Sequence, residues 1–413
     1  MRQLLVIVRT GMHTPRFWVV LIVWGISLLY VLFQGGKTSL MLFAMISLLV
    51  VYLVAGGLSG IGQAKGSRVL STEEEHGELL YAGDHVKVKL QFHVPGFLPL
   101  PYVIIREVLK RHNGETWSFE DSVIPNFRGS GDLLFQTPPL ERGRYQFMET
   151  ECVSEDIFGL IEHKGNFNVI GQFRVLPRTV CITSWQMYDR HSRLSGPQAT
   201  LAASRRETTQ INGVRDYVYG DRISRIHWNA TARTGSWKSK EFEYDSVPKT
   251  LLVLDTTASN YASPQQFELA VSTAASMLEY AKRERMCLGL VVVGHNIKAF
   301  QPSDLEADRQ RMMHYLVDVG TDGTGKVLTR LEKGSRHIPH STFFTYISPQ
   351  SGQPVADVFR WAESRGMKPS HIVLGGTGNR HESWVKLLRS RGLFGGCLSD
   401  LSELPALLGG FRT

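Results

Sequence analysis

Two long apolar stretches within the first sixty residues constrain the fold of this chain more than any other feature. Residues 17–33 and 40–58 hold no charged side chain, and only the segment QGGKTS separates them. As helices they would span roughly 26 and 28 Å, close to the roughly 30 Å hydrocarbon core of a bilayer. Because each helix would be apolar on every side, membrane spans are favoured over a buried helical pair. The sequence therefore predicts a membrane anchor of two transmembrane helices within residues 1–60.

Positive charge flanks the two stretches on their outer sides, at Arg2, Arg9, Arg16, Lys65 and Arg68. The turn between the stretches holds Lys37 alone. Since basic residues collect on the cytoplasmic side of a membrane, this asymmetry predicts a multi-pass protein of the cell membrane. Its N-terminus and everything after residue 60 would lie in the cytoplasm. The four cysteines are far apart and form no CxxC motif, which fits a reducing compartment.

Residues 61–180 carry the pattern of short β-strands. The segment HVKVKLQFHV (85–94) alternates polar and apolar residues, as a half-buried strand does. Similar segments such as PYVIIREVLK, RGRYQFMETECV and QFRVLP follow at short intervals, separated by Gly, Pro and Asn. The region is therefore predicted to be an all-β sandwich of immunoglobulin-like size.

From residue 249 onward, continuous apolar segments alternate with amphipathic ones. KTLLVLD (249–255) is typical of a strand buried on both faces, and Ser263 with Pro264 begins a predicted helix. Further buried strands are expected at 286–294, 341–347, 371–376 and 393–398. Helices are expected at about 304–317, 326–333, 353–365 and 381–390. This alternation predicts an α/β doubly wound domain over residues 249–413.

The first buried strand of that domain ends in DTTAS, with Asp255, Thr257 and Ser259 at alternate positions. Ligands of open α/β sheets bind beyond the carboxyl ends of the strands, and one carboxylate with two hydroxyls suits Mg²⁺ or a similar divalent cation. The pattern resembles the metal-ion-dependent adhesion site of von Willebrand factor type A domains. That resemblance implies a further ligand, Thr324, and a later aspartate that TYISPQSG does not supply. The alternative is a polar loop that caps its helix and binds no metal.

No complete catalytic motif is present, so the chain is not expected to be an enzyme. GTDGTGKV (320–327) matches part of a P-loop, but Val327 stands where Ser or Thr must hold Mg²⁺. The sequence has no HExxH and no G-x-S-x-G, and no cysteine has an evident histidine partner.

Residues 181–248 are predicted to connect the sandwich and the α/β domain, and they carry a strongly basic stretch. Between 205 and 240 the basic residues are Arg205, Arg206, Arg215, Arg222, Arg225, Arg233, Lys238 and Lys240. One interpretation pairs these arginines with nearby carboxylates, while Tyr217 and Trp228 fill the seam between the two domains. The alternatives are contact with anionic lipid, nucleic-acid binding, or a metal-dependent hydrolase built on Asp216, Asp221 and His227.

The segment VRDYVYGDRISRIHWNATARTG, followed by KEFE and LLVLDTTAS, resembles the signature of the domain-of-unknown-function 58 family. The matching positions include Arg215, Asp216, Tyr217, Gly220, Asp221, Arg225, Trp228 and Arg233. His227 departs from the Asp that many members carry, which puts one salt bridge in doubt. PPLERGRYQF and SEDIFGLIEHK resemble the sandwich segment of the family, with Ile157 in place of a proline. The resemblance covers essentially the full chain.

This resemblance implies a von Willebrand factor A-like fold for the C-terminal domain and no established enzymatic activity. Members of the family are commonly encoded beside MoxR-type AAA+ ATPases and transglutaminase-like membrane proteins. The expected function is therefore a membrane-anchored, cytosolic-facing scaffold or adaptor that binds protein partners through its C-terminal domain. Nucleic acid is the less favoured partner.

Overall fold

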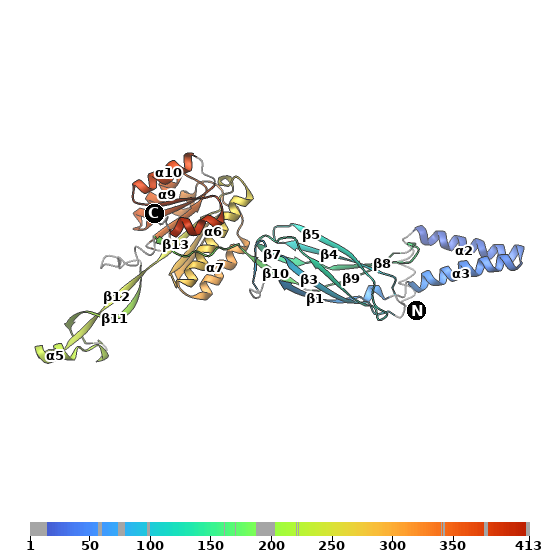
Figure 1. Cartoon of the computed structure of the whole chain (residues 1–413), viewed down its shortest axis with the longest axis horizontal. Coiled ribbons are helices and arrows are strands. Elements are labelled where there is room, and N and C mark those ends of the chain that lie inside the picture. Colours follow the sequence, from blue (N-terminus) through green and yellow to red (C-terminus); the bar gives the residue numbers. More distant parts are fainter. Residues whose placement is uncertain are drawn as a thin grey trace. The chain divides into compact units, whose positions relative to one another are not determined.

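A computed structural model of the full chain describes residues 15–56, 60–72, 79–96, 100–160, 162–169, 171–186, 203–219, 221, 223–339, 341, 343–375 and 379–409. The chain divides into two compact units, residues 1–176 and residues 177–413. Each unit contains its own sheets and its own hydrophobic core (Figure 1).

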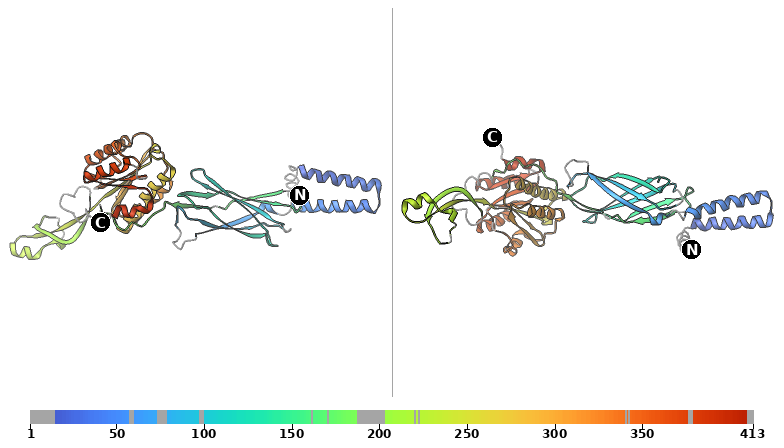
Figure 2. Two further views of the ribbon diagram at one scale, coloured as in Figure 1. Left: turned by 45° about the horizontal axis from the view of Figure 1, so that its top comes forward. Right: turned by 90° about the horizontal axis from the view of Figure 1, so that it is seen from below.

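Two helices, α2 (Pro15–Gln34) and α3 (Lys37–Gly56), form a hairpin in the first unit. Gly35 and Gly36 make the turn with positive φ angles of 62° and 97°, a backbone conformation that glycine adopts without strain. The helices lie side by side in every view (Figure 2), and Trp24 Nε1 donates a hydrogen bond of 2.9 Å to Ser47 Oγ. Many of their apolar side chains are exposed.

The two predicted membrane spans differ in length. The helical segment that contains α3 is, in the described part of the chain, the one segment long and apolar enough to cross a membrane. In α2 the apolar run covers only Trp18–Gln34 and is shorter. Length and composition therefore support a spanning helix at the second stretch, whereas the first forms a helix that falls short by the same measure.

After the helical hairpin, the described residues of the first unit include ten strands in two sheets. The smaller sheet has the order β1-β3-β6, and the larger has the order β2-β10-β7-β4-β8-β9, with β5 paired to β4. Their bounds are β1 Lys65–Thr72, β2 Leu80–Tyr81, β3 Val86–His93, β4 Val103–Arg111, β5 Thr116–Val123, β6 Ser130–Gln136, β7 Gly143–Phe147, β8 Thr150–Glu155, β9 Glu162–Phe167 and β10 Gln172–Leu176. A 3₁₀ helix, η1 (Ile61–Gln63), precedes β1.

The two sheets pack face to face. Leu90 and Phe92 of β3 lie in one core cluster with Val103 and Ile105 of β4, and all four side chains are buried. The alternating burial of β3 confirms the half-buried strand that the sequence pattern predicts. An all-β region of two packed sheets is thus present, and its likeness to immunoglobulin domains stays a prediction.

The second unit contains a six-stranded sheet of order β15-β14-β13-β16-β17-β18. Every neighbouring pair is parallel except β14 and β15, and the sequence prediction missed β15. The strand bounds are β13 Thr250–Asp255, β14 Leu288–Val293, β15 Ile297–Ser303, β16 Phe343–Ser348, β17 Lys368–Leu374 and β18 Phe394–Leu398. This is the 3-2-1-4-5-6 order of doubly wound α/β folds, so the predicted fold class of this domain is confirmed.

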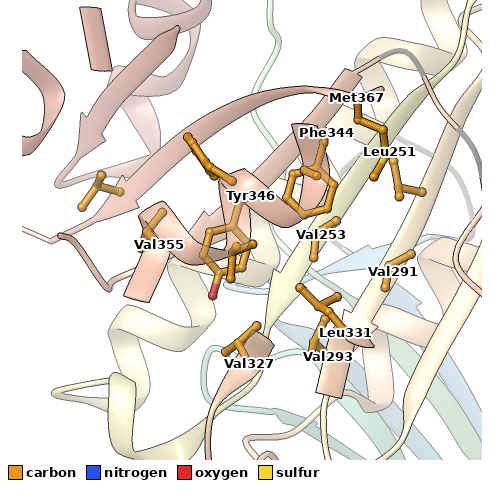
Figure 3. Packing of buried hydrophobic residues seen from close by; sticks show 14 of the residues in the cluster. Leu251, Val253, Val291, Val293, Val327, Leu331, Phe344, Tyr346, Val355 and Met367 are labelled. Carbon is orange, nitrogen blue, oxygen red and sulfur yellow. The ribbon is translucent and has the colours of Figure 1, made fainter. Parts of the chain in front are cut away.

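Helices cover both faces of this sheet (Figures 1 and 2). Their bounds are α6 Pro264–Arg283, α7 Glu306–Asp318, α8 Val327–Lys333, α9 Gln353–Ser364, α10 Asn379–Ser390 and α11 Leu404–Gly409, with 3₁₀ turns η3 Ala258–Asn260 and η4 Leu401–Glu403. On one face, Val253, Val293 and Phe344 of the sheet pack against Leu331 of α8 and Val355 of α9 (Figure 3). The expected Ser263 cap is present, since its side chain accepts a hydrogen bond from Gln266 N at the start of α6.

Most of the predicted connector is a long β-hairpin, which the sequence prediction did not include. Strands β11 (Ala203–Asp216) and β12 (Lys238–Pro248) pair antiparallel, from Ala203 opposite Pro248 to Asp216 opposite Lys238. Between them lie η2 (Ile223–Arg225) and a short helix, α5 (Trp228–Thr234). Because β11 and β12 form a two-stranded sheet of their own in the described part of the chain, the hairpin does not require the hydrophobic alternation of a half-buried strand.

Candidate functional site

The carboxyl end of β13 places Asp255 in a fully buried position, with 0% of the residue exposed. Its Oδ1 accepts hydrogen bonds from the Thr257 backbone N–H at 2.9 Å and from Thr257 Oγ1 at 2.5 Å. Its Oδ2 accepts from Asn260 Nδ2 at 2.6 Å. The loop that follows the strand therefore folds back over the carboxylate and saturates it with local donors.

The neighbouring strand β16 adds two hydroxyl groups to this site. Tyr346 OH and Ser348 Oγ each lie 3.3 Å from Asp255 Oδ2, and Tyr261 OH donates to the Asp255 carbonyl oxygen. Burial, and after it the nearby Asp255 carboxylate, raises the pKa of both the Tyr346 and the Tyr261 phenol well above its usual value. Both hydroxyls are therefore protonated at neutral pH and can donate hydrogen bonds.

A guanidinium group provides the positive charge next to this carboxylate. Arg330 of α8 lies with Nη2 3.9 Å from Asp255 Oδ1 and donates from the same nitrogen to Thr257 Oγ1. Its Nη1 donates to the carbonyl oxygens of Val293, at 2.9 Å, and Gly294, at 2.8 Å. Arg330 thus connects α8 to the carboxyl ends of β13 and β14, a role that the sequence prediction missed.

The loop that carries Thr324 lies beside the loop after β13, as the resemblance implies. Gly323 N donates to the Thr256 carbonyl at 3.0 Å, and Ala258 N donates to the Gly323 carbonyl at 3.3 Å. Thr256 Oγ1 also donates to Asp322 Oδ1 at 2.9 Å. The Thr324 side chain itself is exposed.

The four predicted metal ligands therefore differ in their surroundings. Asp255 and Thr257 are buried, whereas Ser259 and Thr324 are exposed. Within the described ranges, no three or more His, Cys, Asp or Glu side chains gather as a metal site requires. Hydrogen-bond donors surround both oxygens of Asp255, and the adjacent charge is already positive. As they lie here, these residues do not fit a divalent cation, which needs several free oxygen ligands.

The family-signature residues lie at the far end of the hairpin, in residues 213–240, here named the tip module. Arg215 holds Asp221 through two parallel hydrogen bonds, Nη1 to Oδ2 at 2.8 Å and Nη2 to Oδ1 at 2.7 Å. This contact, followed by a bond from the Val218 N–H, lowers the pKa of Asp221. Tyr217 OH donates to the Asp221 carbonyl at 3.2 Å. The loop after β11 is therefore fixed by its own side chains.

The return of the tip module to β12 is fixed in the same way. His227 Nδ1 accepts from Ala230 N at 3.1 Å and caps the start of α5, and Gly235 caps its end with φ 67°. Lys238 Nζ lies 2.5 Å from Asp216 Oδ1. Asp216, Asp221 and His227 thus have separate structural contacts and form no common centre, in contrast to the hydrolase alternative.

The outer surface of the tip module is aromatic and apolar. Tyr219 is 100% exposed and Trp228 is 61% exposed, and Val218, Ile223 and Trp237 are also exposed. The Trp237 ring lies 6.2 Å from that of Trp228 and 5.8 Å from that of Tyr217, centroid to centroid. Trp228 therefore packs against Trp237 within the tip module. Among the other signature residues, Arg233 is exposed at the end of α5, Arg225 lies in η2, and Gly220 lies outside the described residues.

A family model described as "Protein of unknown function DUF58" matches residues 213–342. The match begins with the tip module, contains both Asp255 and Arg330, and confirms the resemblance drawn from the signature residues. No curated protein matches the sequence.

Solved structures with related folds include von Willebrand factor type A from Catenulispora acidiphila, which is 11% identical with a TM-score of 0.29 over 40% of this chain and 42% of that chain. Proximal thread matrix protein 1 from the mussel byssus is 15% identical with a TM-score of 0.30, over 40% of this chain and 46% of that chain. The same mussel protein with a zinc-occupied MIDAS motif is 14% identical with a TM-score of 0.30, at the same coverage. This chain spans less than half the length of each. At these TM-scores the likenesses carry no argument about this chain.

Proposed function

We propose a function from the site itself, because the family model that matches residues 213–342 describes a family of unknown function: a membrane-tethered scaffold that binds a protein partner. The observation that carries this proposal is the exposed aromatic surface of the tip module. Exposed apolar patches of this kind mark sites of interaction in folded proteins. Tyr, Trp and Arg are also the residue types that contribute most to binding at protein interfaces.

The internal contacts of the tip module favour a preformed docking surface. The paired hydrogen bonds between Arg215 and Asp221, and the ion pair of Lys238 with Asp216, hold both sides of the loop. A rigid surface loses less conformational entropy on binding than a flexible loop does. Tyr219 and Trp228 can therefore bind a partner without first being ordered by it.

The charge of the tip module indicates the chemistry of the partner. Residues 213–240 contain six basic and two acidic residues, so the exposed aromatic side chains stand in a positive field. Complementary partners carry acidic side chains around an apolar pocket. The family resemblance supplies the candidates, a MoxR-type AAA+ ATPase and a transglutaminase-like membrane protein. The proposed tether is the α2–α3 hairpin, with both helices crossing the membrane and the tip module in the cytoplasm.

The alternative functions receive less support from the contacts. Arg215 and Lys238 are already paired with carboxylates, so the basic stretch presents less free positive charge to nucleic-acid phosphates than its composition suggests. The separate contacts of Asp216, Asp221 and His227 do not favour a hydrolase. A divalent cation at Asp255 is not part of the proposed docking surface, which lies on the tip module.

The test uses the full chain in lipid nanodiscs and the purified cognate MoxR-type ATPase, with affinity measured by biolayer interferometry. Tyr219→Ala and Trp228→Ala should each weaken binding roughly 30-fold, as for a hot-spot residue worth about 2 kcal/mol. Phe127→Ala is the matched control, because Phe127 is an aromatic side chain of the first unit that is 97% exposed. Unchanged affinity in both tip variants, or an equal loss in the control, would reject the tip module as the docking surface.

A further inference from the structure

We infer that the guanidinium of Arg330 occupies the place of a divalent cation at the carboxyl end of β13. The site has the Asp255 and Thr257 pair that suggests a metal in the sequence. In the structure, one Arg330 nitrogen contacts Thr257 Oγ1 and lies 3.9 Å from Asp255 Oδ1. A positive charge carried by the chain itself therefore lies beside the two residues expected to be the first metal ligands, which are hydrogen-bonded to each other.

The balance of charge supports this assignment. Arg330 is paired with the Asp255 carboxylate, whose side chain is completely buried, while that of Arg330 is 12% exposed. A single guanidinium neutralises a single carboxylate, whereas a divalent ion beside both would leave an uncompensated buried charge, which is costly. The ion would also need to displace the donors Thr257, Asn260 and Tyr346 from the carboxylate oxygens.

The backbone around the guanidinium is shaped to admit it. Gly323 stands directly over Arg330, and a Cβ atom at this position would collide with Arg330 Nη1 and lie 3.0 Å from Thr257 Cα. The Gly323 backbone is in turn bridged to Thr257. The close approach of the two loops thus depends on glycine at 323, and it leaves room for the planar guanidinium head. This observation is independent of the charge argument.

Arg330 also connects two further backbone groups to this site. Its Nη1 donates to the carbonyl oxygens of Val293 and Gly294 at the end of β14. Arg330 is therefore a positioning residue that joins α8, β13 and β14 with one side chain. The consequence is that this edge of the sheet is held together without metal and does not capture an acidic partner through a bound cation. This holds whether or not the tip module is the docking surface.

The test measures Mn²⁺ binding to the full chain in detergent, by the loss of the electron paramagnetic resonance signal of free Mn²⁺. Mn²⁺ binding by the wild type should not depend on Asp255, so Asp255→Asn should bind the same amount as the wild type. Arg330→Ala should gain Mn²⁺ binding, and the double variant Arg330→Ala/Asp255→Asn should lose it again. Asp255-dependent binding by the wild type would overturn the inference, as would a folded Arg330→Ala chain that gains none.

A second measurement covers the case in which Arg330→Ala does not fold. Thermal unfolding of the wild type is compared with and without a divalent-cation chelator, and with added Mg²⁺. The midpoint should be the same in all three conditions. A midpoint that the chelator lowers and Mg²⁺ restores, with Asp255→Asn insensitive to both, would show a resident cation and refute the inference.

Discussion

A pH-dependent loss of stability is expected from one buried imidazole behind the Asp255 site. His371 of β17 is fully buried, and its Nδ1 accepts a hydrogen bond of 3.0 Å from Trp384 Nε1. Its ring stacks on Tyr346, with 5.4 Å between centroids, and Tyr346 in turn contacts Asp255. Burial lowers the pKa of His371 from 6.5 to about 3. The ring is therefore neutral in the folded state throughout the physiological range.

The sign of the effect follows from proton linkage. Between pH 6.5 and about 3 the unfolded chain binds a proton on His371 that the folded chain does not bind. The contribution to stability is therefore full above pH 6.5 and declines as the pH falls. With about 1.36 kcal/mol per pKa unit, lowering the pH from about 7 to about 5 should cost about 2 kcal/mol of the free energy of unfolding.

The assay is urea-dependent hydrogen exchange of peptides from β16 and β17 at the two pH values, corrected for the intrinsic rate of exchange. His371→Gln is the matched variant, since its amide oxygen can accept from Trp384 but the side chain does not titrate. The wild type should lose about 2 kcal/mol more than the variant between the two pH values. An equal loss in both chains would refute the assignment of the effect to His371.

Three further predictions concern ion pairs of different burial. Arg330→Met should lower the free energy of unfolding of the α/β domain by about 3–5 kcal/mol, because it leaves the Asp255 carboxylate buried without its partner. Adding Asp255→Asn to Arg330→Met should restore part of the lost free energy of unfolding, measured by urea denaturation. If nothing is restored, the pairing of Arg330 with Asp255 is contradicted. Arg68→Met should cost the β-sheet unit a similar amount, about 3–5 kcal/mol in thermal unfolding, since Glu107 is equally buried and lies 2.6 Å from Arg68. Asp221→Asn should instead speed hydrogen exchange of residues 217–219 while the urea midpoint of the α/β domain stays the same, because its contact with Arg215 orders only the tip module; unchanged exchange would count against that role.

The sequence predicts the elements whose burial is regular and misses those that depend on distant partners. β13 and α6 follow from a continuous apolar run and from a helix with a Ser263 cap and one apolar face. β15, with the sequence IKAFQPS, is an antiparallel strand at the edge of the sheet and lacks the apolar run of a fully buried strand. The hairpin was missed because β11 and β12 form a two-stranded sheet of their own. Neither strand therefore needs the alternation of polar and apolar residues that marks a half-buried strand.

The candidate site shows the same limit more sharply. Asp255 and Thr257 could be predicted because they follow one strand at alternate positions. Arg330 lies 73 residues from Thr257, within a helix whose sequence VLTRLEK has no feature that distinguishes this arginine from an exposed one. Only the folded arrangement brings its guanidinium to the carboxylate. The sequence motif therefore predicts where the polar site lies, but not that the cation beside Asp255 is the Arg330 guanidinium rather than a metal ion.

The tip module and the Asp255 site lie at the two ends of one continuous path along the chain. β12 ends at Pro248 and β13 begins at Thr250, so Lys249 alone separates the hairpin from β13. β13 is hydrogen-bonded to β14 on one side and to β16 on the other, and Arg330 secures its far end. A force applied to the tip module would therefore pass along the backbone to a strand that is paired on both sides and whose far end Arg330 contacts.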